Sequence, residues 1–271
     1  MQTGQSLLQM CGLPRLEGRM LLEFVLDKPR EWLLAHDTDP LSPEVAEKFL
    51  TLAAQRRQGA PMAHLIGWRE FMGHRFAVTP AVLIPRPETE LLVETALDAL
   101  ADRQDPSVLD LGTGSGVVAI SVAHARTEAR VTATDLSVEA LAVAQRNAQA
   151  LGVRVQWWQG SWYEALPTEG RFNLIVSNPP YIAAADEHLR CGDLRFEPAM
   201  ALTDGSTGLT ALEQIIAGAG ERLLSGGELW LEHGFDQAEA VQDLLLGAGF
   251  SAVQTKLDLA GVPRVTGGKW L

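Results

Sequence analysis

The sequence predicts an α/β fold in which a parallel β-sheet, covered by helices on both faces, follows a small helical domain. Two observations carry this prediction. From Pro106 onward, short β-branched runs alternate with helical stretches, and that alternation is typical of a parallel sheet. Residues 1–66, in contrast, read as helices. The chain of 271 residues is long enough for both parts.

The first part of the chain is expected to be a helical domain of residues 1–67. Over residues 15–34, apolar side chains recur at helical spacing: Leu16, Met20, Leu21, Phe24 and Val25. A second helix is expected after Ser42, a good N-cap residue, with Pro43 in its first position and Gly59 at its end. This domain carries no recognisable catalytic motif, so its expected role is substrate recognition.

A β-hairpin is expected to link the two domains over residues 68–87. Two apolar runs in the sequence WREFMGHRFAVTPAVLIP flank Gly73 and His74, which favours two strands joined by a turn. A helix then begins at Glu88, and residues 88–271 form the second domain.

Five runs in the second domain are predicted strands of the parallel sheet: SVLDL, RVTAT, RVQWW, FNLIV and ELWLE. Helical stretches such as SVEALAVAQRNAQALG separate them. Near the end, FSAVQTKLDL and PRVTGGKWL follow each other without a helix between them. These last two strands are therefore expected to pair antiparallel.

Composition and charge exclude several classes of protein. No apolar run approaches the ~20 residues that span a bilayer, and the N-terminus lacks the pattern of a signal peptide. Cys11 and Cys191 form no CxxC pair, and the six histidines lack metal-ligand spacing, so we expect a cytoplasmic protein without a structural metal. Residues 1–75 hold nine acidic and nine basic side chains, so the net charge of −12 arises in the rest of the chain. The acidic charge of that part disfavours binding to nucleic-acid phosphates.

A glycine-rich turn follows the first predicted strand of the sheet and consists of Gly112, Thr113, Gly114, Ser115 and Gly116. Its glycines allow a tight turn and a close approach of the backbone to a ligand. The next strand ends at Asp135, which lies beside the turn in a parallel sheet and can accept both hydroxyls of a ribose. The glycines are closer together than in GxGxxG, which suits a nucleoside without a pyrophosphate. Asp110, before the turn, could hold it or meet an amino group.

The segment SNPPYI, residues 177–182, follows the fourth predicted strand. Its two prolines make the backbone rigid, and ligands of open α/β sheets lie at the carboxyl ends of strands. The glycine turn and this segment should therefore line the same cleft at this edge of the sheet. The side-chain oxygen of Asn178 and the carbonyl of Pro179 can accept both N–H bonds of a planar –NH2 group, while Tyr181 packs on its π-face. Such a clamp would direct the nitrogen at an electrophilic methyl group.

The chain resembles the HemK/PrmC family in seven motifs: GAPMAHLIGWREF, LIPRPETE, LDLGTGSG, SNPPYI, RFEPAMAL, LEHG and RVTGGKW. The resemblance covers nearly the full length. It implies a Rossmann-like, class I methyltransferase that depends on S-adenosylmethionine (SAM), with a small N-terminal helical domain and a β-hairpin linker. It also implies a monomer that binds neither nucleic acid nor membrane.

By this resemblance, the protein would methylate the side-chain nitrogen (N5) of the glutamine in the Gly-Gly-Gln loop of class 1 peptide chain release factors, and so modulate translation termination. The residues implied to hold SAM are the glycine turn (residues 112–116), Asp135, Trp162 and Asn178. The residues implied to hold the glutamine are Asn178, Pro179, Pro180 and Tyr181, and three of these, Asn178, Pro179 and Tyr181, would be catalytic. The family often has an Asp before the tryptophan, where this chain has Ser161.

Three alternatives remain open at this stage. A DNA adenine-N6 methyltransferase shares the NPPY tetrapeptide, but it would need a basic groove and a target-recognition domain. A nicotinamide-dependent dehydrogenase would use GxGxxG and leave SNPPYI without a role. A catalytically silent binding module shares the fold, and incorporation of methyl groups from labelled cofactor would distinguish it from an enzyme.

Overall fold

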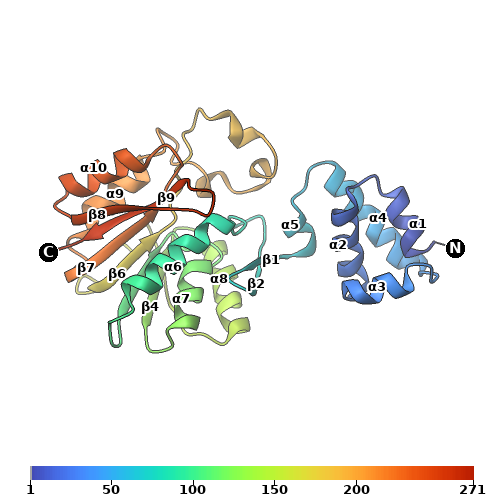
Figure 1. The fold of residues 1–271 in the computed structure, drawn as a ribbon, viewed down its shortest axis with the longest axis horizontal. Helices are drawn as coiled ribbons and strands as arrows, with labels where there is room; N and C mark the ends of the chain where they lie inside the picture. Colours follow the sequence, from blue (N-terminus) through green and yellow to red (C-terminus); the bar gives the residue numbers. More distant parts are fainter. Residues whose placement is uncertain (1) are drawn as a thin grey trace. The chain divides into compact units, whose positions relative to one another are not determined.

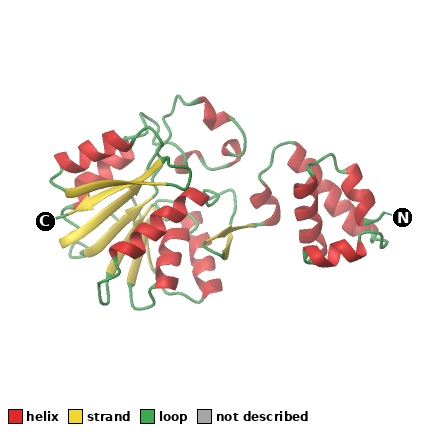
Figure 2. Ribbon diagram, in the orientation of Figure 1, coloured by secondary structure: helices red, strands yellow, loops and turns green. Residues whose placement is uncertain are grey.

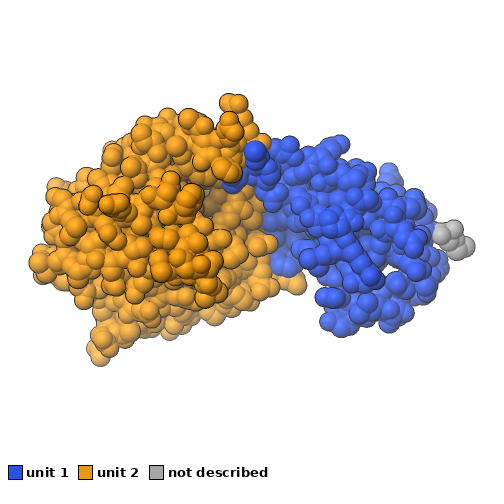
Figure 3. Space-filling model, turned by 45° about the horizontal axis from the view of Figure 1, so that its top comes forward, with its two compact units in different colours: residues 1–68, 191–196 blue, residues 69–190, 197–271 orange. Residues whose placement is uncertain are grey.

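The computed structural model describes residues 2–271, and Figures 1 and 2 show its helices and strands. Its contacts divide the chain into two compact units, coloured separately in Figure 3. Unit 1 comprises the residues up to Trp68 together with Cys191–Phe196, and unit 2 comprises Arg69–Arg190 and Glu197–Leu271. Within the described residues, no helix is both long and apolar enough to cross a bilayer.

Unit 1 is helical, as the sequence predicts. Its helices are α1 (Gly4–Met10), α2 (Arg15–Leu26), α3 (Arg30–His36), α4 (Pro43–Arg57) and α5 (Met62–Ile66). They enclose a core of their own that includes Leu7, Leu21, Leu22 and Phe49. Ser42 caps α4 by accepting a hydrogen bond from the backbone N–H of Val45, as expected.

The predicted helix over residues 15–34 is wrong in its extent, because the structure divides it into α2 and α3. Asp27 adopts a left-handed backbone conformation with φ of 51°, which ends α2. Pro29 precedes the first residue of α3 and disfavours a helical conformation at Lys28. The helical spacing of apolar residues continues across the break, so periodicity alone does not reveal it.

The short segment Cys191–Phe196 belongs to unit 1 although it lies far along the chain. The guanidinium of Arg56 contacts Asp193 at 3.4 Å and Glu17 at 2.7 Å. Arg195 donates a hydrogen bond of 3.0 Å to the carbonyl of Gln58. The sequence analysis assigned this segment to the second domain, so unit 1 is discontinuous in a way that it did not predict.

The β-hairpin consists of β1 (Trp68–Phe71) and β2 (His74–Ala77). Phe71 and Phe76 pack edge to face, with ring centroids 6.0 Å apart, and both are buried in a core of unit 2. A short 3-10 helix, η1 (Pro87–Thr89), then precedes α6 (Glu90–Ala99). The hairpin is therefore packed into unit 2 rather than standing free as a linker.

Unit 2 contains a seven-stranded sheet within the described chain, in the order β5-β4-β3-β6-β7-β9-β8. The strands are β3 (Ser107–Leu111), β4 (Arg130–Asp135), β5 (Gln156–Gln159), β6 (Phe172–Ser177), β7 (Leu223–Glu232), β8 (Ser251–Leu257) and β9 (Pro263–Lys269). The first five are parallel, while β9 runs antiparallel to both β7 and β8, which confirms the predicted topology. β5 begins two residues later than the start of the predicted RVQWW run, and β7 begins before ELWLE.

Helices cover both faces of this sheet (Figure 1). One face carries α6, α7 (Val117–Ala125) and α8 (Val138–Leu151), and the other carries α9 (Thr210–Ala219) and α10 (Ala238–Gly247). Successive strand residues enter opposite cores: Leu174 and Val176 pack with the first group of helices, and Ile175 packs with the second. The loop between β6 and α9 holds three 3-10 helices, η2 (Glu187–Arg190), η3 (Leu194–Phe196) and η4 (Ala199–Ala201).

One buried amide connects three separate segments of unit 2. Asn147, on α8, accepts a 2.8 Å hydrogen bond from the backbone N–H of Ala77. Its Nδ2 donates to the carbonyl of Ala77 at 3.1 Å and to that of Ser115 at 2.8 Å. The hairpin and the glycine turn are therefore fixed to the same helix.

We expect Asn147→Ala to lower the free energy of unfolding by about 2–4 kcal/mol, because it leaves several backbone groups without partners in a buried place. Urea unfolding followed by circular dichroism would measure the loss. Gln149→Ala, an exposed position on the same helix, serves as the control and should change stability by less than about 0.5 kcal/mol. Equal stability of the two variants would contradict this role of Asn147.

Candidate active site

The candidate site forms where β3 and β6 pair at the centre of the sheet. The last residue of β3, Leu111, lies opposite the last residue of β6, Ser177. The Ser177 hydroxyl donates a 2.7 Å hydrogen bond to the Leu111 carbonyl. The chain builds the sheet outward from β3 through β4 to β5 and then returns to β6 on the other side, so this pair is the switch point of the strand order. The glycine turn and the SNPPYI segment consequently emerge side by side.

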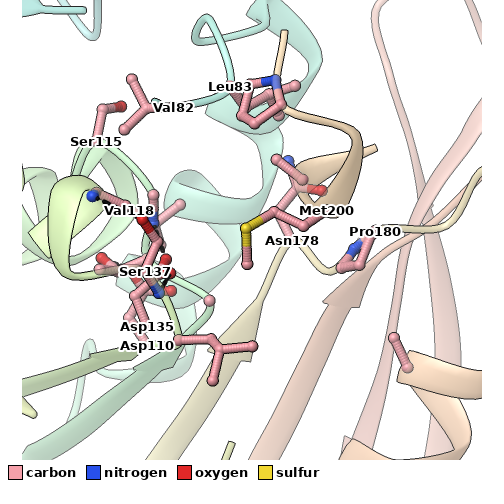
Figure 4. Close-up of a pocket in the computed structure, with 18 of the residues that line it drawn as sticks. Val82, Leu83, Asp110, Ser115, Val118, Asp135, Ser137, Asn178, Pro180 and Met200 are labelled. Atoms are coloured by element: carbon pink, nitrogen blue, oxygen red, sulfur yellow. Dashed lines mark hydrogen bonds between the residues drawn. The ribbon is translucent and has the colours of Figure 1, made fainter. Parts of the chain in front are cut away.

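A cavity of about 310 Å³ opens at this point, within the range of small-molecule sites. Figure 4 shows Asp110, Asp135 and Ser137 on one side of it, and Asn178, Pro180 and Met200 on the other. Further walls come from the glycine turn, from Ser161 and Trp162, from the segment that precedes η1 and from the start of α9. Pro179 and Tyr181 are absent from the described lining.

The glycines of the turn are required by its backbone shape and by close packing. Gly112, Gly114 and Gly116 all have positive φ, at 69°, 56° and 85°. A Cβ on Gly112 would lie 3.2 Å from the Trp162 ring, and one on Gly116 would lie 2.7 Å from Ile120. The turn therefore brings the Trp162 ring against bare backbone and lets α7 begin directly after Gly116.

Asp110, the residue before the last of β3, holds the glycine turn through hydrogen bonds. Its side chain is only 1% exposed, and its Oδ2 accepts hydrogen bonds from the Thr113 hydroxyl at 2.7 Å and from the Ala119 N–H at 3.1 Å. Burial raises the pKa of Asp110 to about 6, against the lowering effect of these two bonds. Of the two roles that the sequence left open, these bonds favour holding the turn.

Asp135 lies at the end of β4 and shapes the same turn from the side. Its Oδ2 accepts the Gly114 N–H at 2.8 Å, and its Oδ1 accepts the Ser137 N–H at 2.9 Å. Burial raises its pKa, while the backbone hydrogen bonds favour the charged form. Each carboxylate oxygen keeps a further lone pair, and the side chain lines the cavity, so Asp135 can accept hydroxyl groups of a ligand.

The SNPPYI segment presents Asn178 and Pro180 to the cavity. The Nδ2 of Asn178 donates a 3.1 Å hydrogen bond to the hydroxyl of Thr89, in η1, which leaves Oδ1 available to a ligand. Tyr181 instead packs against the core on the α9 face of the sheet, and its hydroxyl donates to Glu232 at 3.3 Å. Burial raises the pKa of Tyr181, which keeps the phenol neutral. The stacking role expected for Tyr181 therefore stays a prediction.

Sequence reasoning assigned no role to Thr89 and Glu232, although they lie in the quoted motifs LIPRPETE and LEHG. It also left the roles of Arg86 and Glu90 open. In the structure, Arg86 forms an ion pair with Glu197 and lines the cavity, whereas Glu90 accepts the Met72 N–H at 2.8 Å and so holds the hairpin. No group of three or more metal-binding side chains occurs among residues 2–271.

Known proteins share both parts of this chain. The family described as PrmC N-terminal domain matches residues 1–67, and the family described as Methyltransferase small domain matches residues 87–205. A protein of Bordetella pertussis named release factor glutamine methyltransferase is 61% identical over 97% of this chain and 98% of its own length. The chain belongs to the HemK/PrmC family. A protein of the same name from Escherichia coli is 42% identical over 98% of this HemK/PrmC chain and 95% of its own length.

Solved structures support the fold of this HemK/PrmC protein. A 16S rRNA methyltransferase of T. thermophilus, in complex with AdoMet and guanosine, matches with a TM-score of 0.57 and 23% identity over 75% of this chain and 50% of its own. A methyltransferase from Pyrococcus furiosus matches with a TM-score of 0.55 and 18% identity over 80% of this chain and 96% of its own. The fold is that of the class I SAM-dependent methyltransferases. The family match and the named relatives show that the chain is a methyltransferase.

The residues of the cavity fit SAM, the cofactor of this HemK/PrmC enzyme. The turn around Gly112 and Gly114 offers backbone without side chains, and Asp135 offers acceptor oxygens for ribose hydroxyls. Leu136 lines the same cavity and is 57% exposed, so it offers apolar surface to a flat base. Ser161 also lines the cavity and can accept one hydrogen bond.

Asp135→Ala should weaken the binding of SAM by roughly tenfold to a hundredfold, because it removes the ribose acceptor and releases the Gly114 N–H from the turn. Isothermal titration calorimetry with SAM would measure the change in Kd. Asp98→Ala, at an exposed position on α6, removes the same charge far from the turn and serves as the control. An unchanged Kd for Asp135→Ala would exclude the ribose assignment.

Proposed function

We propose that this enzyme transfers a methyl group from SAM to the side-chain amide nitrogen of the glutamine in the Gly-Gly-Gln motif of peptide chain release factors. The observation that carries the proposal is the position of Asn178, which lines the cavity with its Nδ2 bound to Thr89 and its Oδ1 available. The name of the relatives in Bordetella pertussis and Escherichia coli, release factor glutamine methyltransferase, supports the substrate.

An amide nitrogen is a weak nucleophile, because its lone pair is delocalised into the carbonyl. Asn178 Oδ1 and the Pro179 carbonyl would each accept one N–H of the glutamine amide, which favours positive charge on the nitrogen in the transition state. The same two bonds hold the nitrogen in line with its target, which contributes through proximity. SAM supplies an electrophilic methyl group on a sulfonium sulfur.

The product nitrogen must lose one proton after the new carbon–nitrogen bond forms. An N-protonated amide is a strong acid, so water or the Asn178 oxygen can take this proton. The chain therefore needs no general base beside the nitrogen. Its contribution is to bind, orient and polarise the amide.

The acidic charge of residues 76–271, which contain the cavity, disfavours the competing function of a DNA adenine methyltransferase. Residues 76–271 contain 25 acidic and 13 basic side chains. A nucleic-acid enzyme with the same tetrapeptide would need basic side chains to neutralise phosphates near the flipped base. A folded protein loop makes no such demand.

The proposal is tested by incubating a release factor with enzyme and SAM and then measuring the mass of its Gly-Gly-Gln peptide by mass spectrometry. Wild type should add one methyl group to the glutamine, and a peptide with Ala in place of this glutamine should gain none. Asn178→Ala should lower kcat by about 10²–10³, because it removes one of two acceptors for the reacting nitrogen. Its Kd for SAM should stay within about tenfold of wild type.

A methylated wild-type product together with full activity of Asn178→Ala would exclude the clamp but retain the reaction. A wild-type enzyme that leaves the glutamine unmodified would exclude the proposed function itself.

Unit 1 is expected to select the release factor, because a clamp around one amide cannot distinguish one glutamine among many. A chain shortened to residues 69–271 keeps Phe71 and Phe76 in their core and should still bind SAM. Its kcat/KM on intact release factor should fall by roughly a hundredfold, through weaker docking and poorer alignment. On a short Gly-Gly-Gln peptide, the shortened and full-length chains should be similarly slow.

The comparison requires steady-state kinetics of both chains on both substrates. Circular dichroism and SAM titration verify that the shortened chain is folded. Equal kcat/KM of the two chains on intact release factor would show that unit 1 is not the selective element.

A further inference from the structure

A buried carboxylate lies beside the SNPPYI segment, and the reaction described above does not use it. Glu232, the last residue of β7, is 1% exposed. Its Oε1 accepts the hydroxyl of Tyr181 at 3.3 Å. Its Oε2 has no aligned hydrogen-bond partner among the described residues, while the Thr89 side chain lies close enough to the carboxylate to lower its pKa.

The hydroxyl of Thr89 lies between this carboxylate and the clamp. Thr89 is 2% exposed, and its Oγ1 accepts the Nδ2 of Asn178 at 3.1 Å. A buried hydroxyl also needs an acceptor for its own hydrogen. The unpartnered Oε2 of Glu232 is the nearby group that can be that acceptor. A small rotation of the Thr89 hydroxyl would then join the three side chains in a line of hydrogen bonds that ends at the cavity.

We propose that Glu232 is a positioning residue, which acts through Thr89 to decide which end of the Asn178 amide faces the substrate. This inference rests on the clamp of the proposed function. An ionised carboxylate can only accept hydrogen bonds, so Thr89 must donate to it. The remaining lone pairs of Thr89 then require a donor, and the –NH2 end of Asn178 is the donor in reach. The oxygen of Asn178 is thereby turned to the cavity, where it can accept the glutamine amide.

Protonation of Glu232 removes this constraint. A neutral carboxyl group can donate to Thr89, and the Thr89 hydroxyl is then able to donate to the oxygen of Asn178. The flipped amide would present its own N–H groups to the N–H groups of the glutamine. Donor would face donor, and the clamp would no longer hold the reacting nitrogen. Methyl transfer should therefore depend on the ionised form of Glu232.

The surroundings of Glu232 bring its titration into the neutral range. Burial raises its pKa to about 7, and the charge of Glu88 adds to this effect. Hydrogen bonds from Thr89 and Tyr181 and the charge of Arg264 lower the pKa and do not outweigh burial. The neighbouring His233 binds the Gly234 carbonyl and the Thr266 hydroxyl, and burial lowers its pKa. Because the ionised carboxylate is the active form, kcat should rise as the pH increases through 7.

The test compares kcat on the Gly-Gly-Gln substrate between pH 6 and pH 8 for wild type and five variants, two of which are controls. Wild type should gain about tenfold over this interval, as expected for one group with a pKa near 7. Glu232→Gln should be roughly 10–100 times slower at pH 8 and lose the rise with pH, because its amide can donate to Thr89 at every pH. Thr89→Val should be similarly slow, and Thr89→Ser, which restores the hydroxyl, should recover most of the rate.

Two controls separate positioning from general loss of structure. Thr95→Val removes another buried threonine hydroxyl, which donates to the helical carbonyl of Leu91. Glu228→Gln changes a buried carboxylate on the same strand, where it accepts the Trp230 indole N–H at 2.9 Å. Both should keep the wild-type rate and pH profile. The Kd for SAM of all five variants should stay within about threefold of wild type, since none of the exchanged groups touches the glycine turn.

A wild-type rate and pH profile in Glu232→Gln would overturn the inference, as would a Thr89→Val variant as fast as Thr95→Val. Wild-type enzyme that transfers no methyl group to the glutamine at any pH would instead overturn the proposed function, and the inference with it. If kcat of Glu232→Gln still rises with pH, another group titrates, and the inferred role of the Glu232 charge is wrong.

Discussion

The parallel pairing of β3 with β6 is the contact on which the site depends. Because Leu111 lies opposite Ser177, the glycine turn and the SNPPYI segment leave the sheet at the same height and on neighbouring strands. A shift of one residue would send every inward side chain of a strand to the opposite face, so the two cores fix this register strongly. The packing of the sheet thus determines the distance between the glycine turn and the SNPPYI segment.

Buried polar groups give the site its rigidity. Asp110 fixes the glycine turn and Asn147 fixes the same turn to α8, so the turn is held from two directions. Burial of a carboxylate is unfavourable unless hydrogen bonds compensate it, and the raised pKa values of Asp110 and Glu232 record that cost. Because these groups are satisfied only by one set of partners, they define one arrangement of the turn, which a reaction needs when it depends on orientation.

Much of this architecture can be read from the sequence, because its signals are local. The strands, the antiparallel end of the sheet and the glycine turn follow from short runs of residues, and the strand order brings turn and clamp together. Pro29 is a local signal for the break between α2 and α3, but the apolar spacing over residues 15–34 favours one continuous helix and conceals it. Contacts between distant residues were not predictable. Thr89 meets Asn178 across 89 positions, and no pattern in either motif specifies that pair.

The discontinuity of unit 1 has a consequence for synthesis on the ribosome. Arg56 contacts Asp193, which is translated 137 residues later. The α-helical unit leaves the exit tunnel first and can collapse around its own core, but its surface stays incomplete until most of the sheet strands have been made. Unit 1 therefore begins to fold early but gains its last contacts only after residue 196 has been made. A nascent chain arrested before residue 191 would carry the helices without their last contacts, open to chaperones or proteases that the finished enzyme excludes.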